Sequence, residues 1–88
     1  MNALKTINTD DVYHFVERLM SECRKGNELG LLGQLDDALH LGSSGLEILG
    51  AIRKVLVENR GVVVRLLGST GGAAADMVIA FVDKAYGR

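Results

Sequence analysis

Apolar residues recur at intervals of three and four along most of this chain, and this spacing constrains its fold more than any other feature. In the first such segment the apolar positions are Val12, Phe15, Val16, Leu19, Met20 and Cys23. An α-helix has 3.6 residues per turn, so these side chains share one helical face. Asn8 or Thr9 can cap its first turn, and Gly26-Asn27 is typical of a left-handed stop. We therefore expect a helix over residues 10–25.

Three further segments have the same helical spacing, namely residues 28–41, 46–59 and 73–87. Gly30 and Gly33 lie inside the second of them, where each glycine costs about 1 kcal/mol relative to alanine. They indicate either close approach to a neighbouring backbone or a helix that begins late.

Residues 55–72 allow two interpretations. The β-branched run Val62–Val64 favours a strand, which could pair with Val55–Val57 in a hairpin. An isolated hairpin is only marginally stable, so we prefer a short helix over Val62–Leu67. The glycines and hydroxyl residues of 68–72 predict a flexible turn. The predicted fold class is all-α: a single domain over residues 1–88, with four main helices and a fifth short one near Val62–Leu67.

Length and charge bound what such a domain can do. The chain has 88 residues, enough for one core and too few for two, and its formal net charge of −1 does not favour polyanion binding. The sequence contains no uninterrupted apolar run long enough to predict a membrane span, and its first residues lack the pattern of a signal peptide. Cys23 is the single cysteine, which fits a reducing compartment. We expect a cytoplasmic protein.

Two groups of side chains could hold a metal ion. They are Asp10, His14 and Glu17 in the first helix and Asp36, Asp37 and His40 in the second. Paired charges of this kind are also the ordinary content of a solvated helix face. Cys23 continues the apolar stripe of its helix, so we expect a small buried side chain rather than a nucleophile. We predict no catalytic residue, metal, cofactor or small-molecule substrate.

Residues 41–49 resemble the prosthetic-group segment of acyl carrier proteins, which are also small four-helix domains. This resemblance implies that Ser44 would carry phosphopantetheine. The family's Asp-Ser-Leu core is absent, because Ser43 precedes Ser44 and Gly45 follows it. Ser44 and Glu47 also have the spacing of a capping box, which accounts for the serine without modification.

The spacing from Ala38 to Ile48 also resembles a helix-turn-helix. This resemblance implies a recognition helix over residues 46–59, with Arg53 and Lys54 reaching phosphates. The first turn of that helix offers no Arg, Asn or Gln to base edges, so nucleic acid is not the favoured partner.

Charge is unevenly distributed along the chain. Residues 1–50 carry 8 acidic and 4 basic side chains, and residues 51–88 carry 3 acidic and 6 basic ones. Such polarity suits pairing between copies or docking to a charged protein. The candidate interaction surface is Arg53, Lys54, Arg60 and Arg65. We expect a non-enzymatic accessory, regulatory or toxin-neutralising module that binds a protein partner or itself as a homodimer. The alternatives are a helix-turn-helix-like DNA-binding regulator and an acyl-carrier-like protein.

Overall fold

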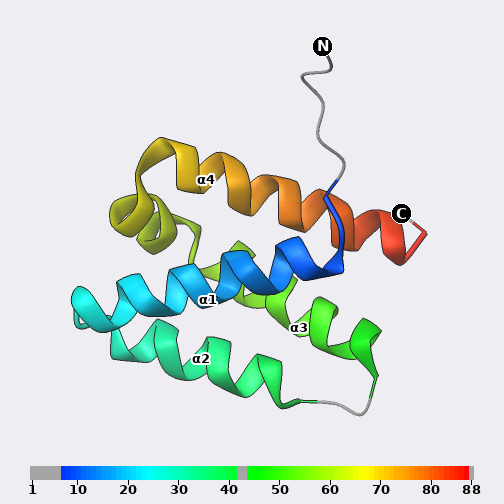
Figure 1. Cartoon of the computed structure of the whole chain (residues 1–88), viewed down its shortest axis with the longest axis horizontal. Helices are drawn as coiled ribbons and strands as arrows, with labels where there is room; N and C mark the ends of the chain where they lie inside the picture. Colours follow the sequence, from blue (N-terminus) through cyan, green and yellow to red (C-terminus); the bar gives the residue numbers. More distant parts are fainter. Residues whose placement is uncertain (1–6, 42–43, 88) are drawn as a thin grey trace.

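Four α-helices make up most of the chain that this computed structural model describes, residues 7–41 and 44–87. They are α1 (Thr9–Lys25), α2 (Leu29–Leu39), α3 (Gly45–Glu58) and α4 (Arg60–Ala85) (Figure 1). No strand occurs in these two ranges. The all-α fold class is confirmed. Gly42 and Ser43, which join the second and third segments of helical spacing, lie outside the described residues.

α1 begins and ends at residues that its sequence indicates. Asn8 Oδ1 accepts the backbone N–H of Asp11 at 3.0 Å, and Asp11 Oδ2 accepts the backbone N–H of Asn8 at 3.0 Å. This capping box satisfies two of the N–H groups near the start of the helix, so Asn8 is the cap and Thr9 the first helical residue. At the other end the left-handed residue is Asn27, with φ of 58°, and not Gly26, with φ of −90°.

α2 and α3 lie close to their predicted positions. α2 begins at Leu29, before both Gly30 and Gly33, so the alternative of a late helix start is wrong. α3 follows Ser44, whose Oγ accepts the backbone N–H of Glu47 at 3.2 Å. The serine therefore caps the helix, as its position predicts, through one half of the expected capping box.

α4 contains the short helix predicted at Val62–Leu67, and the strand alternative is wrong. The helix bends at Gly68, where φ is 79° and ψ is −175°, a conformation essentially restricted to glycine. The chain does leave the helical conformation within the turn predicted over residues 68–72, but only at Gly68, and the extension of that turn over residues 69–72 is wrong. Gly71 and Gly72 are buried in the bend because the side chains of Leu67 and Val64 occupy the space that a Cβ would need.

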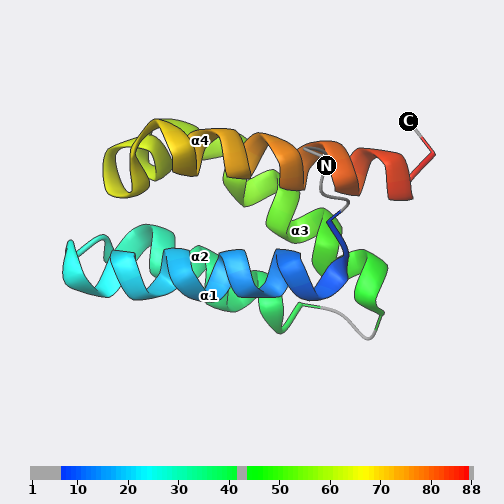
Figure 2. The same cartoon turned by 45° about the horizontal axis from the view of Figure 1, so that its top comes forward.

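The helices form a ring in which each contacts two others. α1 contacts α2 and α4, and α3 contacts the same two helices (Figure 1). Figure 2 shows α4 above the α1–α2 pair, with α3 crossing obliquely between them. α1 and α4, the first and last helices, are therefore neighbours in a flat body that measures 36 × 35 × 19 Å.

The core is built from apolar side chains of all four helices. Its fully buried large members are Val12, Val16, Leu19, Cys23, Leu35, Ile52, Leu56, Val63 and Val82. Among the described residues no polar or charged side chain is buried. Polar chemistry in this part of the chain is thus confined to the surface and its hollows.

Candidate protein-docking site

Three of the four cations predicted as an interaction surface are held in ion pairs within the chain. The pairs are Arg53 with Asp83 at 2.6 Å, Arg60 with Asp76 at 2.7 Å, and Arg65 with Glu28. Lys54 is exposed and makes no ion pair in the part of the chain that the structure describes. The three arginines therefore connect segments of the fold, and their contact with a partner stays a prediction.

The pair of Arg60 and Asp76 spans the bend at Gly68. Arg60 donates from Nε and Nη2 to the two carboxylate oxygens of Asp76 at 2.9 and 2.7 Å. This hydrogen bonding lowers the pKa of Asp76 and raises the pKa of Arg60 from their ordinary values. Whatever stability the pair contributes is present at neutral pH and is lost as the pH falls through the lowered pKa of Asp76.

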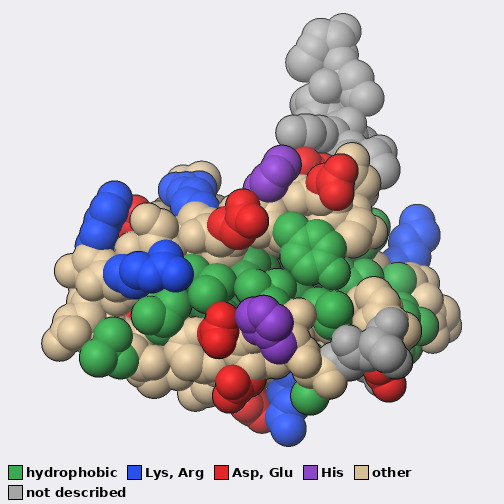
Figure 3. Space-filling model, turned by 60° about the horizontal axis from the view of Figure 1, so that its bottom comes forward, with side chains coloured by type: hydrophobic (Ala, Val, Ile, Leu, Met, Phe, Trp, Pro, Cys, Tyr) green, Lys and Arg blue, Asp and Glu red, His purple; other side chains and the backbone are tan. Residues whose placement is uncertain are grey.

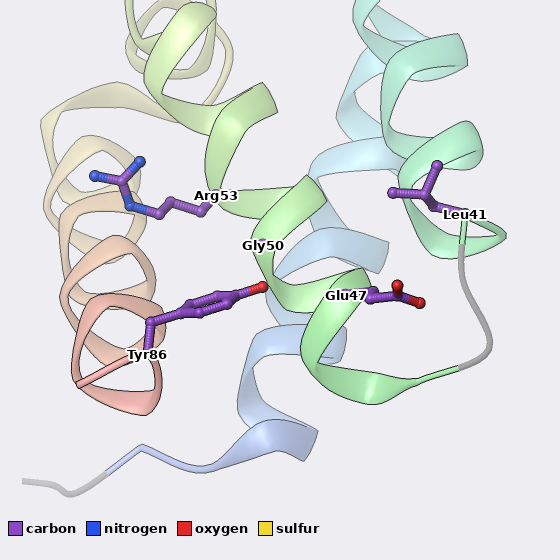
Figure 4. Close-up of a pocket in the computed structure, with 5 residues that line it drawn as sticks. All are labelled: Leu41, Glu47, Gly50, Arg53 and Tyr86. Atoms are coloured by element: carbon purple, nitrogen blue, oxygen red, sulfur yellow. The ribbon is translucent and has the colours of Figure 1, made fainter. Parts of the chain in front are cut away.

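A hollow of about 600 Å³ lies between α3 and the end of α4 (Figure 4). Its lining residues are Leu41, Glu47, Gly50, Arg53 and Tyr86. Glu47 and Arg53 point away from each other (Figure 4), and Tyr86 Oη donates to the backbone carbonyl of Leu46 at 2.7 Å. These polar groups do not converge on a common point, as acid–base or nucleophilic catalysis would require.

A second hollow, of about 290 Å³, lies between α1 and α2 and is called here the α1–α2 furrow. Its lining residues are Met20, Arg24, Leu29, Leu32, Gly33 and Asp36. Figure 3 shows the face that contains it, where a band of hydrophobic side chains runs between the two helices. Leu29 is 61% exposed, although burying a leucine side chain fully is worth about 1.5–3 kcal/mol. Leu32 is half-buried and Met20 is buried, so the uncovered apolar surface of the furrow belongs mainly to Leu29 and, in part, to Leu32.

Two glycines beside the furrow are not required by any packing contact among the described residues. A Cβ added at Gly30 or Gly33 would meet nothing within 4 Å outside the local helix. Both residues are exposed on α2 and have φ below zero, so neither internal packing nor backbone conformation calls for glycine. Within the described residues neither alternative that the sequence offered is seen, because α2 begins before both glycines and no neighbouring backbone comes close to either of them. Close approach by a backbone of another chain stays a prediction.

The side chains that could have held a metal ion do not assemble in the described part of the chain. His40 Nδ1 lies 3.7 Å from Asp36 Oδ1 on the same exposed turn, and the described residues contain no group of three or more side chains able to hold a metal ion. Ser44, the serine of the acyl-carrier resemblance, is exposed at the start of α3 and uses its hydroxyl as a helix cap. Of the two cations in the helix-turn-helix resemblance, Arg53 is paired with Asp83 and Lys54 is exposed.

Cys23 occupies the interior position that its place in the apolar stripe predicts. Its side chain is fully buried, and burial raises the pKa of its thiol. The reactive thiolate is accordingly scarce at neutral pH, as expected of a structural cysteine.

Because Cys23 is buried, we predict that thiol reagents modify it only when the core opens. We expect the thiol to react with Ellman's reagent at least roughly a hundredfold more slowly in the folded chain than in urea, because reaction requires an opening of the core. The absorbance of the released thiolate at pH 8 measures both rates. Equal rates in the two states would contradict the position assigned to Cys23.

α4 is long and apolar enough, by length and composition, to meet the usual test for a membrane-spanning helix. Its most apolar window has a mean hydropathy of 1.4 and is 28% buried. The same helix bends at Gly68 and supplies Val63, Val78 and Val82 to the core. The expectation that the chain does not span a membrane stays a prediction.

Sequence reasoning placed the candidate surface on the cations of the second half of the chain and missed the α1–α2 furrow. The usable signal was the pair of glycines three residues apart in α2, because a helix interior disfavours them unless something packs closely there. Comparisons with family models, with curated proteins and with solved structures found no match.

Proposed function

We propose that this chain acts without catalysis, by binding a protein through the α1–α2 furrow, as a small cytoplasmic accessory, regulatory or toxin-neutralising module. The observation that carries the proposal is the furrow with its exposed Leu29, next to glycines at which a Cβ would meet nothing within 4 Å among the described residues. A groove of this kind suits a helix of the partner, whose apolar side chains enter the groove while its backbone approaches the glycines.

The surroundings of the furrow fit the same proposal. Tyr13 and Leu39 are only partly buried and pack on the core from α1 and α2, which extends the apolar surface beyond the furrow itself. Arg24 and Asp36 add one cation and one carboxylate to the lining. An apolar centre with charges at its border is the usual composition of a protein interface.

A photo-crosslinking residue placed at position 29 tests this proposal in the native cell. We expect covalent protein adducts from position 29 and none from position 57, because Val57 is also exposed but belongs to α3. Adducts are detected by the gel shift of the tagged full chain after irradiation. Equal labelling from both positions, or no adduct from position 29, would contradict binding in the furrow.

A further inference from the structure

We infer that the protein bound in the α1–α2 furrow is a second copy of this chain, related to the first by a two-fold axis through the centre of the furrow. This inference rests on the proposed function and names the partner of the same site. Two observations carry it: the positions of the charges at the ends of the furrow, and the glycine near its centre.

The charges of opposite sign lie at opposite ends of the furrow. Arg24 lies at the end where α1 finishes and α2 begins, beside Leu29. Asp36 is seven residues farther along α2 than Leu29, about 10 Å away at a rise of 1.5 Å per residue. Figure 3 shows Lys and Arg side chains gathered at the first of these ends and acidic side chains on both sides of the middle of the apolar band.

No charged side chain lines the centre. The residues between the two ends are Met20, Leu32 and Gly33. Glu17 lies seven residues before Arg24 on α1, which places it on nearly the same helical face and toward the Asp36 end. At the furrow itself the cation Arg24 therefore lies at one end and the carboxylates of Asp36 and Glu17 lie toward the other, with Met20, Leu32 and Gly33 between them.

A two-fold axis makes this arrangement self-complementary. In a two-fold interface each residue i that contacts residue j is matched by the reverse contact. A two-fold rotation about an axis through the centre of the furrow brings Arg24 of each copy to Asp36 of the other. Two ion pairs then form across the interface. Glu17 provides a second carboxylate near each guanidinium, whereas a parallel arrangement would oppose like charges.

The charged groups concerned are available for such pairing. Within the described ranges Arg24 makes no ion pair and is exposed. Asp36 Oδ1 lies 3.7 Å from His40 Nδ1 of the same helical turn, and both side chains are largely exposed. A second copy can therefore pair these charges without breaking a connection between helices of the monomer.

Gly33 allows the two copies to approach closely. It lines the furrow near the proposed axis, and a Cβ there would meet nothing in its own chain. In the dimer the two α2 helices pass each other at this point, and the absence of side chains lets Leu29 and Leu32 of each copy reach the apolar surface of the other. This accounts for a glycine that the monomer does not need.

Charge reversal tests the pairing in the purified full chain. We expect a dimer in sedimentation equilibrium, and we expect Arg24→Asp and Asp36→Arg each to weaken its association roughly tenfold or more through repulsion of like charges. An equimolar mixture of the two variants should recover dimer, since a carboxylate then faces a guanidinium at both contacts of the mixed pair. Lys54→Glu, at an exposed α3 position, is the matched control and should associate like the natural chain.

Gly33→Ala separates a role in association from a role in the monomer. We expect it to raise the unfolding temperature of dilute monomer, because alanine favours the helix, and to weaken dimerisation at the same time. A natural chain that stays monomeric at several hundred micromolar, or a variant mixture that does not recover dimer, overturns the second copy as partner. If position 29 then crosslinks a different protein, the proposed function stands with another partner, and if it crosslinks nothing, both fail.

Discussion

Replacing Ile52 by alanine is expected to lower the free energy of unfolding by about 2–5 kcal/mol. Ile52 is fully buried in α3, the helix that connects α2 and α4 in the ring, so its truncation removes contacts with several elements and leaves a cavity. A domain of this size has a total stability of only about 5–15 kcal/mol. Urea unfolding followed by circular dichroism at 222 nm measures the change.

The control for this substitution is Val57→Ala in the same helix. Val57 is 48% exposed, and surface substitutions of this kind usually change stability by no more than about 0.5 kcal/mol. If the two variants unfold at the same urea concentration, Ile52 is not in the core and the packing of α3 described above is wrong.

Replacing Gly71 by alanine is expected to destabilise the chain by about 1–3 kcal/mol, although alanine is the better helix former. A Cβ at this position would collide with Cβ of Leu67, an atom fixed by the backbone, and would lie 3.0 Å from Leu67 Cδ1. The bend at Gly68 produces this closeness, so relief of the collision requires the bend itself to open. Thermal unfolding of the purified variant provides the measurement.

Gly61→Ala is the matched control, in the first turn of the same helix. A Cβ at Gly61 would meet nothing within 4 Å, and its φ is below zero. This variant is expected to gain about 0.4–1 kcal/mol from the lower chain entropy of its unfolded state. We expect Gly71→Ala to lower the free energy of unfolding and Gly61→Ala to raise it. If both substitutions raise it, the close packing at the bend is disproved.

The helices could be predicted because the apolar spacing of each helix is contained in its own segment of the sequence. The stripe of α1 and its cap at Asn8 are local, so a sequence contains both. The conformation of residues 68–72 could not be predicted from local sequence, because glycine favours turns and also permits close packing inside a helix. Gly71 is buried because the side chain of Leu67 packs over it at the bend. This contact depends on the folded structure and is not visible in the local sequence.

The candidate site was less accessible to sequence reasoning. The basic residues Arg53, Arg60 and Arg65 stood out by composition, but their acidic partners lie 30, 16 and 37 residues away in the chain. The furrow is assembled from α1 and α2, and its exposure depends on α3 and α4 packing elsewhere. Periodicity shows which helical face is apolar, but it does not show which border of that face remains uncovered.

The adjacency of α1 and α4 has a consequence for the synthesis of this chain. At roughly 5–20 residues per second, a ribosome adds residue 85 about 3–12 s after residue 25. During that interval the part of α1 that contacts α4 in the folded chain is uncovered. The nascent chain is therefore most exposed to aggregation and to chaperones between the emergence of α1 and the arrival of α4.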